Sequence, residues 1–284
     1  MIIIEKYSKE EKTGKIANYE KISAFDKLFI VKLDKNGNAL IKKEIAIVEN
    51  ILAKEEITHF DRMELLRIYN IAYHESGKIE GVYSLDSSAT NCDFCKAFRE
   101  YAKEHPELNI VCGKCYDFAQ EQYRYSALNR HTLNMVIMES VEFAIEELAT
   151  LPCGELARVN SSGDSSNDIY ASNMIKFAIA HPFSKVAIWS KHTITYIHAC
   201  NKYGKPGNVT MIQSSPYVDK AVKLAKYFDY VFTVYMDKDK VKEALENGAC
   251  ECNGKKCNKC GYKCYYGAWE SGANIAELLR WIFV

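Results

Sequence analysis

The sequence has no long apolar segment. Its 284 residues contain no run of about 18 uninterrupted apolar residues, the length that a membrane-spanning helix needs. The opening MIIIEKYSKEEK has an apolar run of only three residues, too short for the apolar core of a secretory signal. We therefore predict a cytoplasmic protein with no membrane partner.

An excess of charge of either sign is also missing. Lys and Arg together number 37, as do Asp and Glu, so no global positive field favours a phosphate backbone. A Walker-type phosphate loop is absent as well. Nucleic acid is therefore not indicated as a partner.

The chain is large enough for one domain with an appendage, since 48% of its residues are hydrophobic. Residues Leu28–Leu33 and 39–47 are β-leaning runs on either side of an Asn-Gly turn, which predicts a hairpin. Asp61 and Glu64 have the spacing of a helix-capping pair and predict a helix over 62–76. We predict an α+β appendage at residues 1–76 and a larger α/β domain at 77–284.

Strand-like and helix-like segments alternate in the second half of the chain. A Pro-free, periodic segment at 127–151 predicts a long amphipathic helix. Repeating units of roughly 22 to 30 residues follow it, an alternation typical of βα repeats with a parallel sheet. We predict an α/β fold with a complete or partial TIM-barrel-like sheet. Its strands are expected at Leu156–Val159, Val186–Trp189, Val209–Ile212 and Val231–Val234, and its helices at 168–180, 192–202 and 217–227.

Polar residues follow each expected strand, and in parallel α/β folds ligands gather at the carboxyl ends of strands. The loop from Arg158 to Asp164 contains Gly163 and could hold a substrate carboxylate or phosphate. It could equally be a structural turn in which Arg158 pairs with Asp164. Lys191 follows the next strand and is a candidate substrate-binding cation. Arg158, Asp164 and Lys191 are therefore the candidate substrate-binding residues.

Cysteine, in contrast, is abundant in this sequence. The chain has 11 cysteines, an odd number, and a reducing cytosol disfavours a disulfide framework. Cys153 and Cys200 stand alone and are interpreted as ordinary buried residues. The other nine fall in two groups. The front group is Cys92, Cys95, Cys112 and Cys115, and the rear group is Cys250, Cys252, Cys257, Cys260 and Cys264.

Both groups have the spacing of metal ligands. Two cysteines separated by two residues can bind the same metal centre, and the front group taken alone matches a four-Cys zinc site. The rear group places five thiols within fifteen residues, which suits a loop wrapped around an inorganic core. Spacing does not choose between zinc and iron–sulfur clusters, and scattered buried thiols or disulfides are a third interpretation.

Several segments carry motifs that occur together in one known family. They are Gly77–Leu85, Ile110–Tyr116, Arg158–Asp164, Val186–Lys191, Tyr230–Tyr235 and Cys252–Tyr265. This set resembles the gene product 88-like proteins of phages and mobile elements, over about residues 77 to 266. The resemblance implies an iron–sulfur protein with a barrel-like fold. Our hypothesis for its function is a redox or cluster-dependent enzymatic activity on an unknown substrate.

Seven cysteines match the family pattern, a number that suggests four ligands for one cluster and three for another. The resemblance implies two [4Fe–4S]-type clusters, of which the front one would keep an open iron. An open metal position can bind and polarise a substrate. Cys92 departs from the pattern and could fill that fourth position. The matching residues are Cys95, Cys112 and Cys115 in front, and Cys252, Cys257, Cys260 and Cys264 behind.

A weaker likeness connects the chain to radical S-adenosylmethionine enzymes. Their Cys-x3-Cys-x2-Cys run is absent, and the rear group shows the reversed order, Cys257-x2-Cys260-x3-Cys264. An alternative function is a zinc-stabilised structural or binding module of a phage or mobile element. For the iron–sulfur interpretation, the expected partner is an unknown small-molecule substrate or an electron donor.

Overall fold

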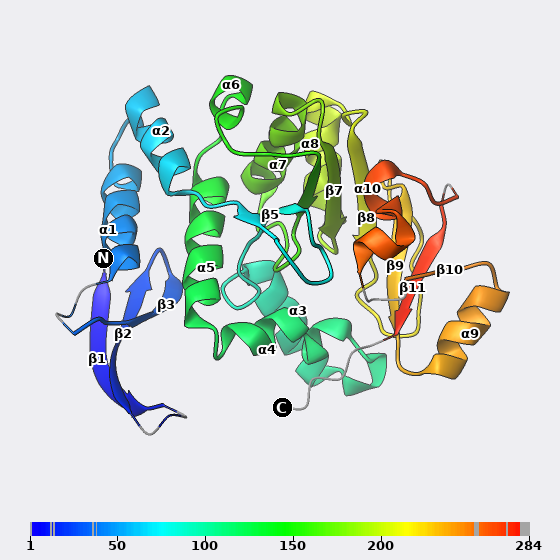
Figure 1. Ribbon diagram of the computed structural model, residues 1–284, viewed down its shortest axis with the longest axis horizontal. Coiled ribbons are helices and arrows are strands. Elements are labelled where there is room, and N and C mark those ends of the chain that lie inside the picture. Colours follow the sequence, from blue (N-terminus) through cyan, green and yellow to red (C-terminus); the bar gives the residue numbers. More distant parts are fainter. Residues whose placement is uncertain are drawn as a thin grey trace.

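The computed structural model describes residues 2–11, 13, 15–35, 37, 39–252, 256–270 and 272–278. These residues form two sheets (Figure 1). The antiparallel amino-terminal sheet contains β1 (Ile3–Glu10), β2 (Ile16–Ala24) and β3 (Lys27–Lys32). The large sheet contains β4 (Ala72–Tyr73), β5 (Tyr83–Leu85), β6 (Leu156–Val159), β7 (Lys185–Ser190), β8 (Val209–Ser214), β9 (Tyr230–Tyr235), β10 (Cys250–Glu251) and β11 (Asn274–Leu278).

Helices occupy most of the connections between these strands. The α-helices are α1 (Leu40–Leu52), α2 (His59–Ile68), α3 (Asp93–Glu104), α4 (Tyr116–Glu121), α5 (Tyr125–Ser140), α6 (Ile145–Leu148), α7 (Asp168–Ala180), α8 (Thr193–Tyr203), α9 (Lys238–Glu246) and α10 (Lys263–Tyr266). The 3₁₀ helices are η1 (Pro106–Leu108), η2 (Val111–Lys114) and η3 (Cys257–Cys260). None of the helices in the described residues combines the length and apolar character needed to cross a bilayer.

The large sheet has the order β10-β11-β9-β8-β7-β6-β5-β4 and is parallel except for the β4–β5 pair. From β5 to β9 its strands therefore lie side by side in chain order. Parallel crossovers are almost always right-handed, so this order keeps the connecting helices on one face of the sheet. The predicted α/β fold with a mostly parallel βα-repeat sheet is confirmed. Among the described strands no pairing joins β4 to β10, so a closed TIM barrel is not observed.

The two faces of the large sheet have different coverings. Ala157 of β6 and Ile188 of β7 belong to the main core, which also contains residues of α5, α7 and α8. Because side chains alternate along a strand, Leu156 and Arg158 lie on the opposite face. There Leu156, Ala187 and Tyr265 form a separate apolar cluster. Helix α10 packs across β7 and β8 on this side, which we call the inner face (Figure 1).

The amino-terminal hairpin is present, but one of its two expected strands is wrong. The first run is β3, which pairs with β2. The second run, 39–47, is part of α1, a helix whose buried residues are Ile45, Val48 and Ile51. Their spacing of three places them on one side of a helix. Tertiary burial along that side, rather than β propensity, decides the structure here.

Two predicted helices differ from the observed structure, one because a side chain bonds its backbone and the other because its backbone angles are not helical. The helix expected at 127–151 is split into α5 and α6, and the Asn173 amide bonds the carbonyls of Met138 and Val141 and the amide of Phe143 in the gap. The helix expected at 217–227 is wrong, because Asp219 and Tyr227 adopt positive φ angles there.

The helix expected at 62–76 is shorter than predicted and begins earlier. Helix α2 is capped by Thr58 together with Asp61, and Tyr69 ends it before β4. Asp61 is therefore the third helical residue of the capping box and not its first member. The other predicted strands and helices of the repeat coincide with β6, α7, β7, α8, β8 and β9.

The amino-terminal sheet is joined to the large domain by two side-chain amides. Asn129 of α5 bonds both the N–H and the C=O of Ile30, and Asn91 does the same to Leu28. These amides extend the hydrogen-bonding edge of β3. One apolar core runs through both parts of the chain, from Phe29 to Phe177. The division at residue 76 stays a prediction.

Candidate metal centres

The front group lies at the carboxyl edge of the large sheet, after β5. Cys92 caps the start of α3, Cys95 is in its first turn, Cys112 is in η2, and Cys115 caps the start of α4. Helix α3 packs against η2, which brings the two pairs together. The amide of Val111 also bonds the carbonyl of Pro216, so η2 is tied to the loop after β8.

The thiols of the front group are largely withdrawn from water. Cys92 is 0% exposed and Cys112 is 7% exposed. The hydrogen bond with Cys92, followed by burial, raises the pKa of Cys95 well above its usual value. Burial also raises the pKa of Cys112, while the charge of Lys191 opposes this rise. Without a positive partner these groups are therefore neutral thiols.

Two features favour the thiolate form at the front group. Backbone amides of Phe118 and Asp117, at the start of α4, donate hydrogen bonds to Cys115 and partly offset the rise in its pKa by burial. Lys191 interacts electrostatically with Cys112, Cys115 and Cys95. No described residue accepts a hydrogen bond from the Lys191 ammonium in the structure, so its charge is available to the sulfur atoms.

Asp164 positions the segment that carries Lys191. Its carboxylate accepts hydrogen bonds from the Ser190 hydroxyl at 2.6 Å and from the Lys191 amide at 2.7 Å. The loops that follow β6 and β7 are thus in direct contact. The Cys92 sulfur lies 3.9 Å from the Asp164 carbonyl oxygen. Asp164 therefore supports the front group through the backbone and is itself 3% exposed.

The loop from Arg158 to Asp164 does not form the internal ion pair considered from the sequence. Arg158 lies on the inner face against Trp189, whereas Asp164 is bonded to Ser190 and Lys191. Within this loop the Ser162 amide is already bonded to the carboxylate of Asp86, at 2.9 Å. The anion that this amide binds is thus supplied by the protein.

Three thiols of the rear group pack over the inner face. Cys257 and Cys264 pack against Leu156 and Ala187, while Cys252 and Cys264 pack against the neighbouring cluster around Ile212. Cys264 thus connects both clusters. Cys260 is in the same 3₁₀ helix, η3, as Cys257. Cys250 belongs to β10 and pairs with β11.

The segment Gly77–Leu85 holds the rear group in place. The carbonyl of Lys78 accepts a hydrogen bond from the Cys257 amide, and the carbonyl of Glu80 accepts one from the Tyr262 hydroxyl. Arg158 supplies the nearest positive charge, which lowers the pKa of Cys257 against the larger effect of burial. Burial raises the pKa of Cys264 to about 12. Positive charge therefore acts on each group of thiols, mainly from Lys191 with Arg99 in front and from Arg158 with Lys78 behind.

A set of buried carboxylates between the groups was not predicted. Burial raises the pKa of Asp117 to about 6, and the nearby charges of Asp86 and Glu121 raise it further. Glu121 accepts hydrogen bonds from Ser88 and Thr90 just before Cys92. Asp117 and Glu121 are four residues apart on α4, a spacing that places them on one side of the helix. No spacing rule links either of them to Asp86, so the set as a whole is marked in the sequence only by its closeness to the cysteines.

The described sulfur atoms fit a thiolate-bound group by their chemistry, but they do not converge on one point. All 11 cysteines are free thiols, so the disulfide interpretation receives no support. In the described part of the chain, no group of three or more Cys, His, Asp or Glu is placed to hold a metal ion. Four soft donors beside one cation are nevertheless the ligand set that zinc or an iron–sulfur cluster takes.

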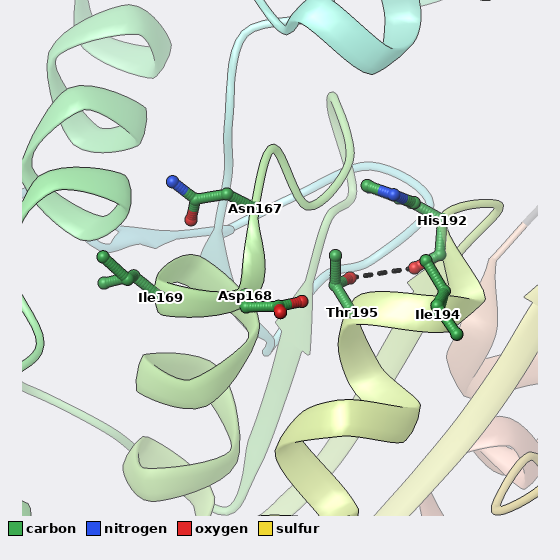
Figure 2. A pocket seen from close by; sticks show the side chains of 6 residues that line it. All are labelled: Asn167, Asp168, Ile169, His192, Ile194 and Thr195. Atoms are coloured by element: carbon green, nitrogen blue, oxygen red, sulfur yellow. Dashed lines mark hydrogen bonds between the residues drawn. The ribbon is translucent and has the colours of Figure 1, made fainter.

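The pocket shown in Figure 2 is separate from both groups. It has a volume of about 450 Å³ and lies between the starts of α7 and α8. His192 at its edge already bonds the Ser165 carbonyl and stacks on Phe94, and Asp168 pairs with His198. Its polar groups are therefore partnered within the protein.

No family model, no curated protein and no solved structure matches the chain.

Proposed function

We propose that the protein binds two iron–sulfur clusters of the [4Fe–4S] type and carries out redox or cluster-dependent chemistry on a small molecule. The observation that carries this proposal is the presence of two separate sets of thiols, each beside positively charged side chains. Lys191 faces the front group and Arg158 faces the rear group. A cluster with thiolate ligands is anionic, so a nearby cation stabilises it and tunes its potential.

In this proposal the rear cluster is held by Cys252, Cys257, Cys260 and Cys264, and the front cluster by Cys95, Cys112 and Cys115. Cys92 either completes the front set or leaves one iron open to substrate. Its complete burial and its hydrogen bond with Cys95 support the first arrangement. The resemblance to gene product 88-like proteins supports the same ligand sets, and membership of that phage and mobile-element family is part of the proposal. So is a partial barrel, for which the open, singly wound sheet is a suitable scaffold.

The test is metal and sulfide analysis of protein purified without oxygen. Two [4Fe–4S] clusters supply about eight iron and eight sulfide per chain and a brown colour. Electron paramagnetic resonance of the reduced sample is expected to give two signals. A colourless protein with zinc and no sulfide would contradict the proposal and favour the zinc-stabilised module. Cys92→Ala then decides the front set, because unaltered cluster spectra mean that Cys92 is not a ligand.

A further inference from the structure

Two arginines of this protein stack on aromatic rings but differ in what their nitrogen atoms bind. The Arg99 guanidinium carbon lies 4.2 Å from the centre of the Phe118 ring, and that of Arg158 lies 4.1 Å from the Trp189 ring. Arg99 donates hydrogen bonds to the carbonyls of Ala89 and Thr90. Arg158 Nε is buried without any acceptor, and no described residue forms an ion pair with this guanidinium.

A second polar group without an acceptor lies beside Arg158. Tyr265 is 1% exposed, and no described residue accepts a hydrogen bond from its hydroxyl. Its ring centre is 6.1 Å from that of Trp189, and the Arg158 guanidinium acts on its hydroxyl oxygen both through its charge and as a hydrogen-bond donor. A buried donor without an acceptor costs about 1–3 kcal/mol. Two such groups at one place indicate that an acceptor from outside the chain belongs there.

The nearby carboxylates do not supply this acceptor. Asp86 accepts hydrogen bonds from Ser84, Ser161 and the Ser162 amide, so its oxygen atoms are already used. Asp117 interacts with the charges of both Arg158 and Lys191 but forms no ion pair with either one in the described structure. The region between the two groups of thiols is thus bordered by two cations whose charges are not neutralised by contact.

We propose that Arg158 and Tyr265 bind an oxyanion, a carboxylate or a phosphate, of the molecule on which the protein acts. A guanidinium stacked by its face keeps its edge free, and this edge matches the two oxygen atoms of a carboxylate or phosphate. The bound group would lie on the inner face between the front and rear groups. The inference rests on the proposed function only for the identity of the ligand as a substrate, because the binding itself needs no iron.

The test is a calorimetric titration of the anaerobically purified protein at constant ionic strength. One titration uses succinate as the carboxylate probe and the other uses inorganic phosphate. Wild-type protein is expected to bind one of them saturably. Arg158→Lys keeps the charge but loses the planar fork, so affinity should fall about tenfold or more. Tyr265→Phe removes one hydrogen bond, with a loss of about three- to tenfold. Arg67→Lys changes an exposed arginine that pairs with Glu64 and should leave binding unchanged.

Iron and zinc are measured on the same samples, which separates this proposal from the iron–sulfur assignment. Binding that depends on Arg158 with unchanged metal content supports the oxyanion site, even in a preparation that holds zinc. The site is refuted if neither probe binds saturably or if Arg67→Lys weakens binding as much as Arg158→Lys. Loss of metal in Arg158→Lys would also overturn it, because Arg158 would then serve as a counter-charge for the rear group.

Discussion

The two groups of thiols are supported in different ways. The front group is built into helix starts and is fixed by neighbours from several parts of the chain, with Cys92 and Cys112 buried. The rear group lies on a short segment laid over the inner face, and all of its cysteines are partly exposed. A site that is held by the fold can exist before its metal binds, whereas a surface segment depends more on the metal for its order. If both groups bind metal as proposed, the contrast predicts a preorganised front site and a rear site that depends on its metal.

Glycine substitutions should give the largest difference between the two groups. Gly163 has a φ of +72°, and a Cβ there would lie 2.2 Å from the Ser87 hydroxyl oxygen and 2.4 Å from its carbonyl oxygen. Gly163→Ala should therefore destabilise the fold by about 3 kcal/mol or more. Gly261 beside the rear group has a φ of +65° but open space around it, so Gly261→Ala should cost only about 1 kcal/mol.

Chemical denaturation measures both changes, and Gly207→Ala is the matched control. Gly207 has no atom within 4 Å of an added Cβ and no positive φ, so its substitution should be nearly neutral. Equal effects of Gly163→Ala and Gly261→Ala would contradict the view that the front group is the more tightly packed of the two.

Cysteine substitutions test the same comparison through the metal. Cys112→Ala and Cys260→Ala should each remove about half of the bound iron if the groups bind separate clusters. Cys260→Ala should in addition open the segment over the inner face to proteolysis, if a bound metal orders that segment as proposed. Cys112→Ala should leave proteolysis of the rear segment unchanged. Iron analysis and limited trypsin digestion provide the readouts, and loss of all iron in either variant would mean that the two groups are one centre.

The repeat itself could be predicted because its strands and helices are locally consistent. Each strand of β6 to β9 is a compact apolar run, and α7 combines a helical pattern with an N-capping Asn167. The failures occur where tertiary contacts override such patterns. Residues 39–47 have β propensity, but Ile45 and Val48 pack as one side of a helix. Nothing in the local sequence shows that Asn173 will interrupt α5 and α6 from another helix.

Only those parts of the candidate site that residue spacing identifies could be predicted from the sequence. Pairs of cysteines with two residues between them identify both groups of thiols. The ends of β6 and β7 identify Arg158 and Lys191 as nearby charges. The sequence gives no sign that Arg158 faces the rear group while Lys191 faces the front group. That assignment follows from the pleat of β6 and from the path of the loops, which are set by the whole fold.

Substitution of the two asparagines that bond β3 tests whether the amino-terminal sheet supports the front group. Asn129→Ala and Asn91→Ala each leave a partly buried N–H and C=O of β3 without a partner, so each should lower stability by about 2 kcal/mol. Asn91 immediately precedes Cys92 and also donates to Thr132. Only Asn91→Ala should therefore change the front cluster's paramagnetic resonance signal. Identical spectra for both variants would mean that the amino-terminal sheet is not coupled to the front group.

The smallest effect is expected at a carboxylate distant from both groups. Hydrogen bonds from Lys176, Tyr203 and Lys202 lower the pKa of Glu142 from 4.5 to about 2. Its stabilising contribution is therefore complete above pH 4.5 and is lost as the pH falls towards 2. Glu142→Gln should be slightly less stable than wild type at pH 6, and this difference should vanish near pH 2. Because acid removes thiolate-bound metals from both proteins equally, the difference between their melting temperatures reports on the scaffold alone. A difference that grows in acid would contradict the lowered pKa of Glu142 and its three hydrogen bonds as the cause.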